Sequence, residues 1–287
     1  MPTSPDLHSH STASDGCLAP ARLLERAYQH GVRVMALTDH DTLEGLPEGQ
    51  ASADALGMDF IPGVEISVTW NGGTVHIVGL GVDQENTELN QGLASLRAFR
   101  DWRAEEIGHR LQRSGYPGLF ERARALSNGR LISRTHFARA LVESGHADSV
   151  AGVFRRFLVR GKPGHVAGEW ASLEDAVCWI RAAGGQAVIA HPARYRMTRT
   201  RLRKLFAAFV DAGGVALEVI SGSHNRDETF TMAAHARDFG LLGSAGSDFH
   251  DPANPWIEMG RLPAMPGGVR PIWHDWELQG LQETAAH

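Results

Sequence analysis

Short runs of apolar residues, bounded by polar turns, recur along the chain and predict buried β-strands. The predicted strands are residues 34–38, 60–68, 75–82, 187–190, 216–220 and 241–245. Asn71-Gly72, between the second and third runs, is a hairpin signal. These two strands are therefore expected to be antiparallel.

Segments with helical periodicity separate several of these runs. The predicted helices are residues 20–30, 173–183, 201–212 and 229–239. Ser172 and Asp175 form a capping box before the second of them, and Gly184-Gly185 ends it. Strands that alternate with helices predict βα units around a largely parallel sheet or barrel, so the expected fold class is α/β.

The stretch from about residue 90 to residue 165 differs from the rest, because it contains no convincing strand. An apolar stripe with helical spacing runs through it at Leu93, Leu96, Phe99, Ile107 and Leu111. We interpret this stretch as a helical insertion between two strands. The expected domains are a first barrel part at 1–92, a helical cap at 93–166 and a second barrel part at 167–287.

Charge is divided unevenly between these parts. The net charge of the chain is −5, but residues 96–165 contain 14 Lys/Arg and 6 Asp/Glu. A basic segment in an acidic chain indicates that the segment meets an anion. The alternative is an arginine-rich helical surface that is only solvated.

Composition narrows the class of protein. No apolar run approaches the length needed to cross a bilayer, and residues 1–6 lack a signal-peptide pattern, so no membrane association is expected. The two cysteines, Cys17 and Cys178, are not in a metal-binding spacing, which favours a cytoplasmic protein. The 15 histidines are a high count and invite a metal hypothesis.

Histidine and carboxylate side chains lie at or near the ends of at least five predicted strands. His8 and His10 share one face if this segment is extended, because side chains two residues apart in a strand point the same way. The other positions are Asp15, Asp39, His40, Asp41, Glu65, His76, His191, Asp248 and His250. Each residue alone is more often a turn or cap residue, but together they predict a site at the rim of a barrel, where such folds carry catalysis.

Glu65 lies inside an apolar strand, where a carboxylate must be paired or bound to metal. A two-residue turn at Asn71-Gly72 would place Ser67 opposite His76, with Glu65 two residues along on the same face. A three-residue loop would place Glu65 and His76 on opposite faces. The pairing of these two side chains therefore depends on the turn.

These residues resemble the motifs of the PHP (polymerase and histidinol phosphatase) superfamily. The matching motifs are Asp6-x-His8-x-His10-Ser11, Thr38-Asp39-His40-Asp41, Glu65, His76, His191-Pro192 and Ser247-Asp248-x-His250. The resemblance implies a distorted (β/α)7 barrel that holds two to three divalent metal ions. Mn²⁺ is favoured, because an aspartate at position 15, a histidine in some relatives, suits harder ions; Zn²⁺, Fe²⁺ and Mg²⁺ are the alternatives.

The resemblance also assigns roles to the residues. One ion would be held by His8, His10, Glu65 and Asp248, a second by Glu65, His76 and His191, and a third by Asp15, His40 and His250. Glu65, His191 and Asp248 are the expected catalytic residues, with a hydroxide between two ions as the nucleophile. Asp6, Asp39 and Asp41 would orient imidazole rings through the nitrogen that binds no metal.

Within the superfamily, the insertion resembles that of stand-alone phosphatases acting on nucleoside 3′,5′-bisphosphates and short 5′-phosphorylated oligonucleotides. Residues 132–139 (ISRTHFAR) and 161–164 (GKPG) carry this resemblance. Arg134 and His136 from the insertion, and Arg194 from the barrel, are the expected substrate-binding residues, because a guanidinium group suits bidentate recognition of phosphate.

The expected reaction is removal of the 3′-phosphate of a nucleoside 3′,5′-bisphosphate to give a 5′-nucleotide. The first alternative is 5′-to-3′ exonuclease activity on short 5′-phosphorylated RNA or DNA. The second is a metallohydrolase of the amidohydrolase type, which usually has a bridging lysine, whereas the only lysines here are Lys162 and Lys204. A non-catalytic metal or nucleic-acid binding module is the third. No obligate protein partner is expected.

Overall fold

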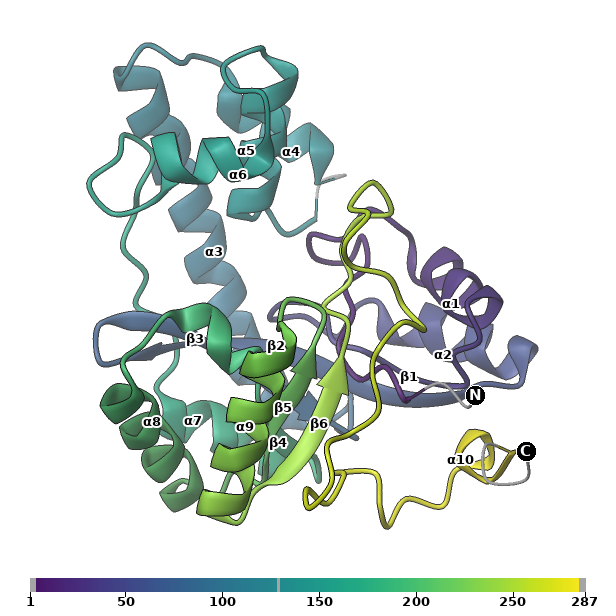
Figure 1. Ribbon diagram of the computed structural model, residues 1–287. Coiled ribbons are helices and arrows are strands. Elements are labelled where there is room, and N and C mark those ends of the chain that lie inside the picture. Colours follow the sequence, from purple (N-terminus) through teal and green to yellow (C-terminus); the bar gives the residue numbers. More distant parts are fainter. Residues whose placement is uncertain (1–3, 128–129, 284–287) are drawn as a thin grey trace.

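A curled six-stranded sheet forms the centre of the larger part of the molecule in the computed structural model, which describes residues 4–127 and 130–283 (Figure 1). The strands follow chain order: β1 (Val34–Leu37), β2 (Asp59–Trp70), β3 (Gly73–Leu80), β4 (Gln186–Ile189), β5 (Ala216–Ser221) and β6 (Leu242–Gly246). β3 is antiparallel to both neighbours, and the other pairs are parallel. All six predicted strands are present, and the prediction of an α/β fold is confirmed.

The predicted hairpin between β2 and β3 is present, and it has the two-residue turn rather than the three-residue loop. Trp70 pairs with Gly73, and Ser67 pairs with His76. Asn71 and Gly72 have φ angles of 47° and 72°, the positive values that a type I′ turn requires at both central positions. The register therefore puts Glu65 and His76 on one face of the sheet.

The N-terminal segment 6–10 lies between the first and the last strand. Asp6 N donates to Val34 O of β1 at 3.0 Å, and Leu7 N donates to Ala245 O of β6 at 2.9 Å. Beyond β6, Asp248 N donates to His8 O at 2.8 Å. This segment therefore brings His8 and His10 to the ends of β1 and β6, although it is far from β6 in sequence.

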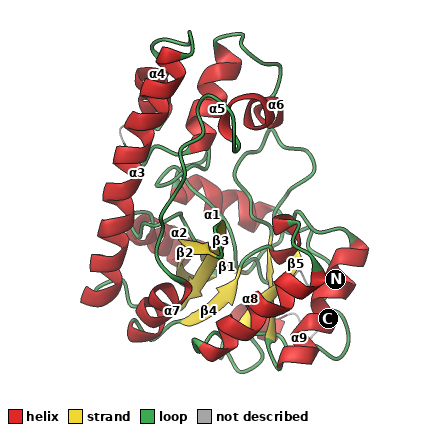
Figure 2. Ribbon diagram, turned by 90° about the vertical axis from the view of Figure 1, so that its left-hand side faces the viewer, coloured by secondary structure: helices red, strands yellow, loops and turns green. Residues whose placement is uncertain are grey.

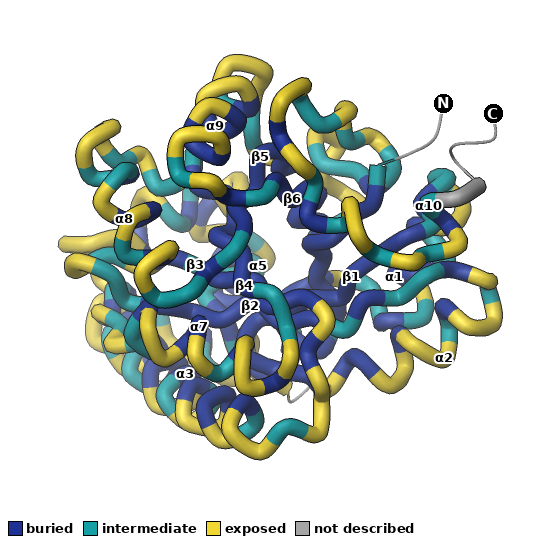
Figure 3. Tube along the Cα trace, turned by 90° about the horizontal axis from the view of Figure 1, so that it is seen from below, coloured by how far each residue is buried: buried dark blue, intermediate teal, exposed yellow. Residues whose placement is uncertain are grey.

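Helices surround the strands, so that the buried strands lie inside and the exposed helical faces outside (Figure 3). These helices are α1 (Pro20–Gln29), α2 (Leu46–Leu56), α7 (Leu173–Ala182), α8 (Arg199–Asp211) and α9 (Arg226–Phe239). The four predicted helices correspond to α1, α7, α8 and α9. Ser172 caps α7 by accepting from Asp175 N at 3.0 Å, which is one of the two bonds of the predicted capping box.

Helix α2 was not predicted from the sequence. Its buried residues are only Leu46, Gly49 and Ala53, so the apolar periodicity is weak. Short helices complete the body: a 3-10 turn, η2 (Pro192–Tyr195), after β4 and α10 (Gln279–Glu283) near the end of the described chain. None of the described helices is both long and apolar enough to span a membrane.

The predicted insertion is helical, and residues 81–127 and 130–185 contribute no strand to the sheet. Its elements are α3 (Thr87–Arg113), α4 (Leu119–Leu126), α5 (Arg134–Glu143), α6 (Val150–Val153) and a π-helix, η1 (Phe154–Leu158). Helix α3 rises from the body to the other helices, which lie above the sheet (Figure 2).

Two hydrophobic clusters divide α3. Leu93 and Leu96 belong to the large cluster of the body, whereas Ile107 and Leu111 pack with Phe137 in a second cluster. Residues 104–127 and 130–166, which surround the second cluster, are called the cap below. The helical cap thus has a hydrophobic core of its own, separate from that of the sheet.

Candidate metal centre

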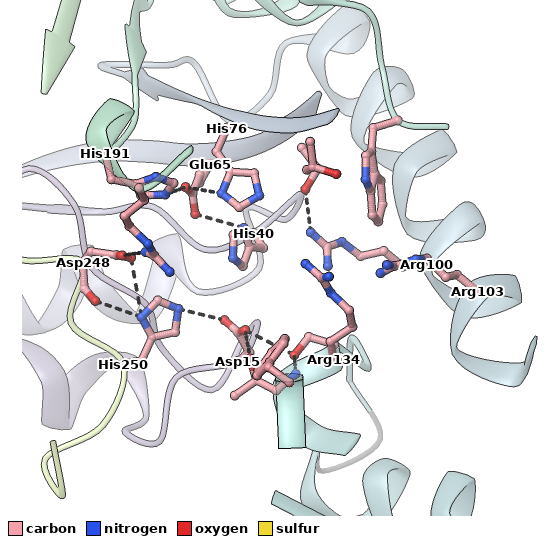
Figure 4. A pocket seen from close by; sticks show the side chains of 17 residues that line it. Asp15, His40, Glu65, His76, Arg100, Arg103, Arg134, His191, Asp248 and His250 are labelled. Atoms are coloured by element: carbon pink, nitrogen blue, oxygen red, sulfur yellow. Dashed lines mark hydrogen bonds and ion pairs between the residues drawn. The ribbon is translucent and has the colours of Figure 1, made fainter. Parts of the chain in front are cut away.

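The structure brings all nine predicted metal ligands into one cluster, seven of which are labelled in Figure 4. Glu65 lies at its centre. Its Oε1 is 2.9 Å from His76 Nδ1 and 3.1 Å from His191 Nε2, and its Oε2 is 2.9 Å from His40 Nδ1. The register of β2 and β3 puts Glu65 and His76 on one face of the sheet. The Glu65 carboxylate therefore lies between imidazole rings that come from three segments of the chain.

His8 and His10 approach Glu65 from the N-terminal segment. Their Nε2 atoms lie 3.4 Å and 3.2 Å from Glu65 Oε2, and the two Nε2 atoms are 3.0 Å from each other. Two nitrogens bonded to one ion at about 2.1 Å are held about 3 Å apart. The side chains are thus already spaced as ligands of a common ion.

Several atoms that face the cluster are buried and form no hydrogen bond with any described residue. They are Glu65 Oε2, His40 Nδ1, His76 Nδ1 and Asp15 Oδ1. Buried polar atoms are nearly always paired, and each of these lies 2.9–3.4 Å from another side chain of the cluster without a hydrogen bond to it, so the atoms are placed to share a cation. Three groups have the closeness that one ion requires: His8/His10/Glu65, His40/Glu65/His76 and His10/Asp15/His40/His250. The residues therefore fit divalent metal ions.

The electrostatics of the cluster also favour a bound cation. Burial opposes the charge on Glu65, but the surrounding rings of His40, His76 and His8 hold the pKa of Glu65 well below its usual range. Burial opposes protonation of His10, but Asp248 and Glu65 raise its pKa to about 10. Burial lowers the pKa of His191 to about 4. The carboxylates stay charged, so the site needs positive charge from protons or from metal.

Backbone geometry is unusual where two of the predicted ligands follow strands. His191, two residues after the end of β4, has φ 31°, and Asp248, two residues after the end of β6, has φ 57°. Positive φ in a residue other than glycine is a strained conformation that often marks functional sites. The two oxygens of the Asp248 carboxylate have different partners. Oδ2 pairs with Arg194, and Oδ1 lies 3.4 Å from His10 Nε2.

Glu218 in β5 belongs to the cluster and was missed in the sequence analysis. Its Oε1 lies 2.6 Å from Nδ1 of His8, and its Oε2 accepts a hydrogen bond of 2.6 Å from the backbone N–H of His191. It is a buried carboxylate inside an apolar strand, which is the signal that identified Glu65. The argument that a carboxylate inside an apolar strand must be paired or bound to metal, applied to residues 216–220, would have identified Glu218.

Asp6, Asp39 and Asp41, which the resemblance expected to orient imidazole rings, have other hydrogen-bond partners among the described residues. Asp6 accepts from Ser247 N at 2.8 Å. Asp39 accepts from Ser11 N and from the hydroxyls of Ser11 and Ser14, at 2.6–2.8 Å. Asp41 accepts from Ser67 N and Arg100. These carboxylates fix the loops that carry the proposed ligands, because they bond backbone N–H groups, serine hydroxyls and, for Asp41, the guanidinium group of Arg100.

Three arginines face the metal cluster across a cavity (Figure 4). Arg100 pairs with Asp41 at 2.6 Å, Arg103 donates to Val166 O, and both guanidinium groups lie over the ring of Trp170, at 4.9 and 5.2 Å from its centre. Arg134 lies over Phe154, and it has no ion pair with a described residue. The sequence analysis predicted Arg134 but missed Arg100 and Arg103.

The arginines repel one another. Burial lowers the pKa of Arg103 to about 9, with Arg134 and Arg100 adding to the effect, and the pKa of Arg134 is lowered by burial and by Arg100. Among the described residues, Asp41 is the carboxylate that forms an ion pair with these three arginines, and it pairs with Arg100. The arginine cluster (Arg100, Arg103 and Arg134) therefore carries uncompensated positive charge that an anion would neutralise.

The two other predicted substrate residues have different environments. Arg194 lines the cavity beside Asp248, as the prediction requires of a phosphate-binding residue. His136 is buried and does not line the cavity, and its Nδ1 accepts a hydrogen bond of 3.0 Å from Ser133 N. This bond completes the capping box of α5, so we reassign His136 from substrate binding to the cap of that helix.

The sequence profile described as "PHP domain" matches residues 6–219, a span that includes seven of the nine predicted ligands. The chain belongs to the PHP domain family. Membership confirms the resemblance deduced from the motifs, and together with the relatives below it confirms the prediction of a phosphoesterase.

Relatives of this PHP protein cover nearly its whole length. A protein of Chromobacterium violaceum named 3′,5′-nucleoside bisphosphate phosphatase is 48% identical, over 96% of this chain and 98% of that protein. A protein of Escherichia coli named 5′-3′ exoribonuclease Rnm is 43% identical, over 95% and 93%. A solved structure described as an amidohydrolase from Chromobacterium violaceum, with bound SO4 and no metal, is 48% identical and has a TM-score of 0.91, covering 94% of each chain.

Proposed function

We propose that this PHP protein removes the 3′-phosphate of nucleoside 3′,5′-bisphosphates to give 5′-nucleotides. The observation that carries the proposal is the arginine cluster opposite the candidate metal centre in one cavity. A simple phosphomonoester needs one anion site, and metal ions provide it. A second group of guanidinium ions across the same cavity matches a substrate with a second phosphate.

The metal centre would be built from the nine ligands predicted from the sequence, in the three groups that the resemblance assigned. Divalent ions there would supply a nucleophilic water at neutral pH and neutralise charge on the transferred phosphoryl group. Asp15, in place of the histidine of some relatives, would add a hard oxygen ligand, which favours Mn²⁺ among the alternatives. Glu65 would link two of the ion positions, because each of its oxygens faces different histidines.

The chain's own cations would hold the substrate between them. Arg194 would contact the phosphoryl group that reacts, because it pairs with Asp248 at the edge of the metal cluster. Arg134 and its neighbours would bind the other phosphate. The rings of Phe154 and Trp170 line the space between, where they could contact ribose or base. Binding energy from the remote phosphate can be used to orient the reacting ester.

The finer description of the fold is part of the same proposal. If segment 6–10 counts as a strand, its hydrogen bonds on both sides would complete the seven strands of a distorted (β/α)7 barrel. Residues 93–166 would then be a domain inserted between β3 and β4, and the cap (residues 104–127 and 130–166) is its separately packed part. The hydrophobic cluster of the cap supports an inserted domain, although Leu93 and Leu96 pack in the body and the change of cluster falls between Leu96 and Ala104.

The test compares kcat/KM for adenosine 3′,5′-bisphosphate, 3′-AMP and histidinol phosphate in the presence of Mn²⁺. We expect the bisphosphate to be preferred by about 10- to 100-fold, the value of one charge-assisted phosphate contact. Equal values for all three substrates would contradict the proposal and leave a phosphatase without a second anion site. Hydrolysis of amide substrates in place of phosphate esters would favour the amidohydrolase alternative.

A 5′-to-3′ exonuclease is the second candidate, and an aromatic series favours it. Trp170 lines the cavity, its ring is 4.9 Å from that of Phe99, and Phe99 is 5.4 Å from Trp102, which is 53% exposed. Aromatic side chains along a groove can stack against successive bases of a single strand. A 5′-phosphorylated trinucleotide that is cleaved with higher kcat/KM than the bisphosphate would support this candidate over the first.

A further inference from the structure

Asp15, a predicted ligand of the third ion, is held by the cap. Its Oδ2 accepts hydrogen bonds from Thr135 Oγ1 at 3.0 Å and from Ser133 Oγ at 3.2 Å. Arg139 Nη2 lies 3.3 Å from the backbone oxygen of Asp15. These donors come from the first turns of α5, about 120 residues along the chain, so the contact exists only when the cap is docked on the body.

The two hydroxyls determine which oxygen of Asp15 is left for a ligand. With Oδ2 occupied, Oδ1 faces the cluster, where it lies 3.3 Å from His250 Nε2 and has no hydrogen bond to a described residue. Asp15 is only 3% exposed. Hydrogen bonds to a carboxylate are charge-assisted and fix its orientation, and partners of this kind typically change metal affinity 10- to 100-fold.

We propose that the cap completes the third ion site: Ser133 and Thr135 hold Asp15 so that Oδ1 binds the ion together with His40 and His250. The inference rests on the proposed metal centre. It couples ion binding to the docking of α5, and such coupling is reciprocal. Arg134 lies between the two hydroxyl residues, so the turn that orients Asp15 also presents the arginine to the substrate.

Thr135→Val tests the proposal, because valine keeps the shape of threonine and removes the hydroxyl. Thr135→Ser keeps a hydroxyl at the same position. Ser144→Ala is the matched control: it removes a hydroxyl from the other end of α5, where Ser144 bonds Ala140 O and Arg122. Ser133→Ala is less clean, since Ser133 also caps α5.

The first measurement is Mn²⁺ binding by equilibrium dialysis. We expect Thr135→Val to weaken one class of sites by about 10- to 100-fold and to leave the others unchanged, while Thr135→Ser and Ser144→Ala bind like the wild type. The second is hydrogen exchange of the α5 amides. Mn²⁺ should slow their exchange in the wild type and less in Thr135→Val.

The outcomes separate the inference from the proposed function. Wild-type binding and exchange in Thr135→Val would overturn the role of the cap while leaving the metal centre intact. A wild-type protein that binds no Mn²⁺, Zn²⁺ or Fe²⁺ would overturn the metal centre itself. Loss of the same sites in Ser144→Ala would show that a general loosening of α5 is responsible, and this too would contradict the specific role of Thr135.

Discussion

Nδ1 of His8 lies 2.6 Å from Oε1 of Glu218, although 210 residues separate them in the chain. The other nitrogen of the ring, Nε2, faces Glu65 and Asp248 at 3.4 and 3.5 Å. A carboxylate on one side of an imidazole and a candidate ion position on the other is the usual arrangement of a metal-binding histidine. Glu218 thus fixes both the orientation and the tautomer of His8.

Glu218→Gln should weaken metal binding without changing a ligand. An amide can still occupy the space and accept from His191 N, but it no longer favours the His8 tautomer that keeps Nε2 free. We expect about a 10- to 100-fold loss of Mn²⁺ affinity, measured by equilibrium dialysis. Glu174→Gln, an exposed position on α7, is the control. Equal affinity in Glu218→Gln and the wild type would remove Glu218 from the site.

Glu65→Ala and Asp248→Ala should each abolish turnover while the protein stays folded, because these side chains add little to the hydrophobic core. A loss of about a thousandfold or more in kcat is expected, equivalent to about 4 kcal/mol of transition-state stabilisation. Far-UV circular dichroism and thermal melting check the fold. A variant that unfolds would instead indicate a structural role for that carboxylate.

Chelation should abolish activity and also lower stability. Ions that bind only the folded protein stabilise it by about 2.7 kcal/mol at one hundred times their Kd. For a chain of this size we expect Mn²⁺, added back after EDTA, to raise the Tm by about 5 °C or more. The measurement is differential scanning calorimetry across a Mn²⁺ titration. A Tm that does not depend on Mn²⁺ would argue that the cluster is held by protons alone.

Arg134→Ala should raise KM for adenosine 3′,5′-bisphosphate at least as clearly as it lowers kcat, because a remote phosphate contact exists in both the ground and transition states. The expected loss in kcat/KM is about 10- to 100-fold. Activity on 3′-AMP should change much less. Arg122→Ala, an exposed arginine of α4, is the control. If both substrates lose activity equally, Arg134 acts on the reacting phosphate or on the docking of the cap.

His136→Asn tests the reassignment of His136 through the effect of pH on stability. Burial lowers the pKa of His136 from 6.5 to about 4. Between pH 6.5 and pH 4 the ring is protonated in the unfolded chain but stays neutral in the folded protein. Protonation therefore favours unfolding, and the stability that the neutral ring contributes is complete above pH 6.5 and is lost as the pH falls towards 4. Urea unfolding at pH 7.5 and pH 5 should show a smaller acid loss in the variant than in the wild type.

The same variant should keep its substrate affinity. Asparagine can accept from Ser133 N, so we expect a loss of about 1 kcal/mol of stability at pH 7.5 from the altered cap, and little change in KM. A KM for the bisphosphate that rises tenfold, with an unchanged pH dependence of unfolding, would restore His136 to the substrate site.

The sequence by itself determined the strands and the hairpin, and it brought together the side chains that we propose as metal ligands. Buried strands are short apolar runs, and the Asn71-Gly72 turn has a local conformational preference, so neither depends on distant residues. The turn then fixed the register that faces Glu65 and His76 the same way. The histidines and carboxylates could be grouped because parallel strands end at a common rim, where each contributes a side chain.

Only the tertiary structure decided what the other side chains of the cavity do. The apolar stripe of α3 is the same whether Arg100 and Arg103 face solvent or the cavity, and contacts with Asp41, Trp170 and Val166 from other segments decide between the two. His136 and Arg134 are two residues apart on α5, and helical geometry points one into the cap and the other into the cavity. The contacts of Glu218 with His8 and of Asp15 with Thr135 join segments more than one hundred residues apart, which no local pattern encodes.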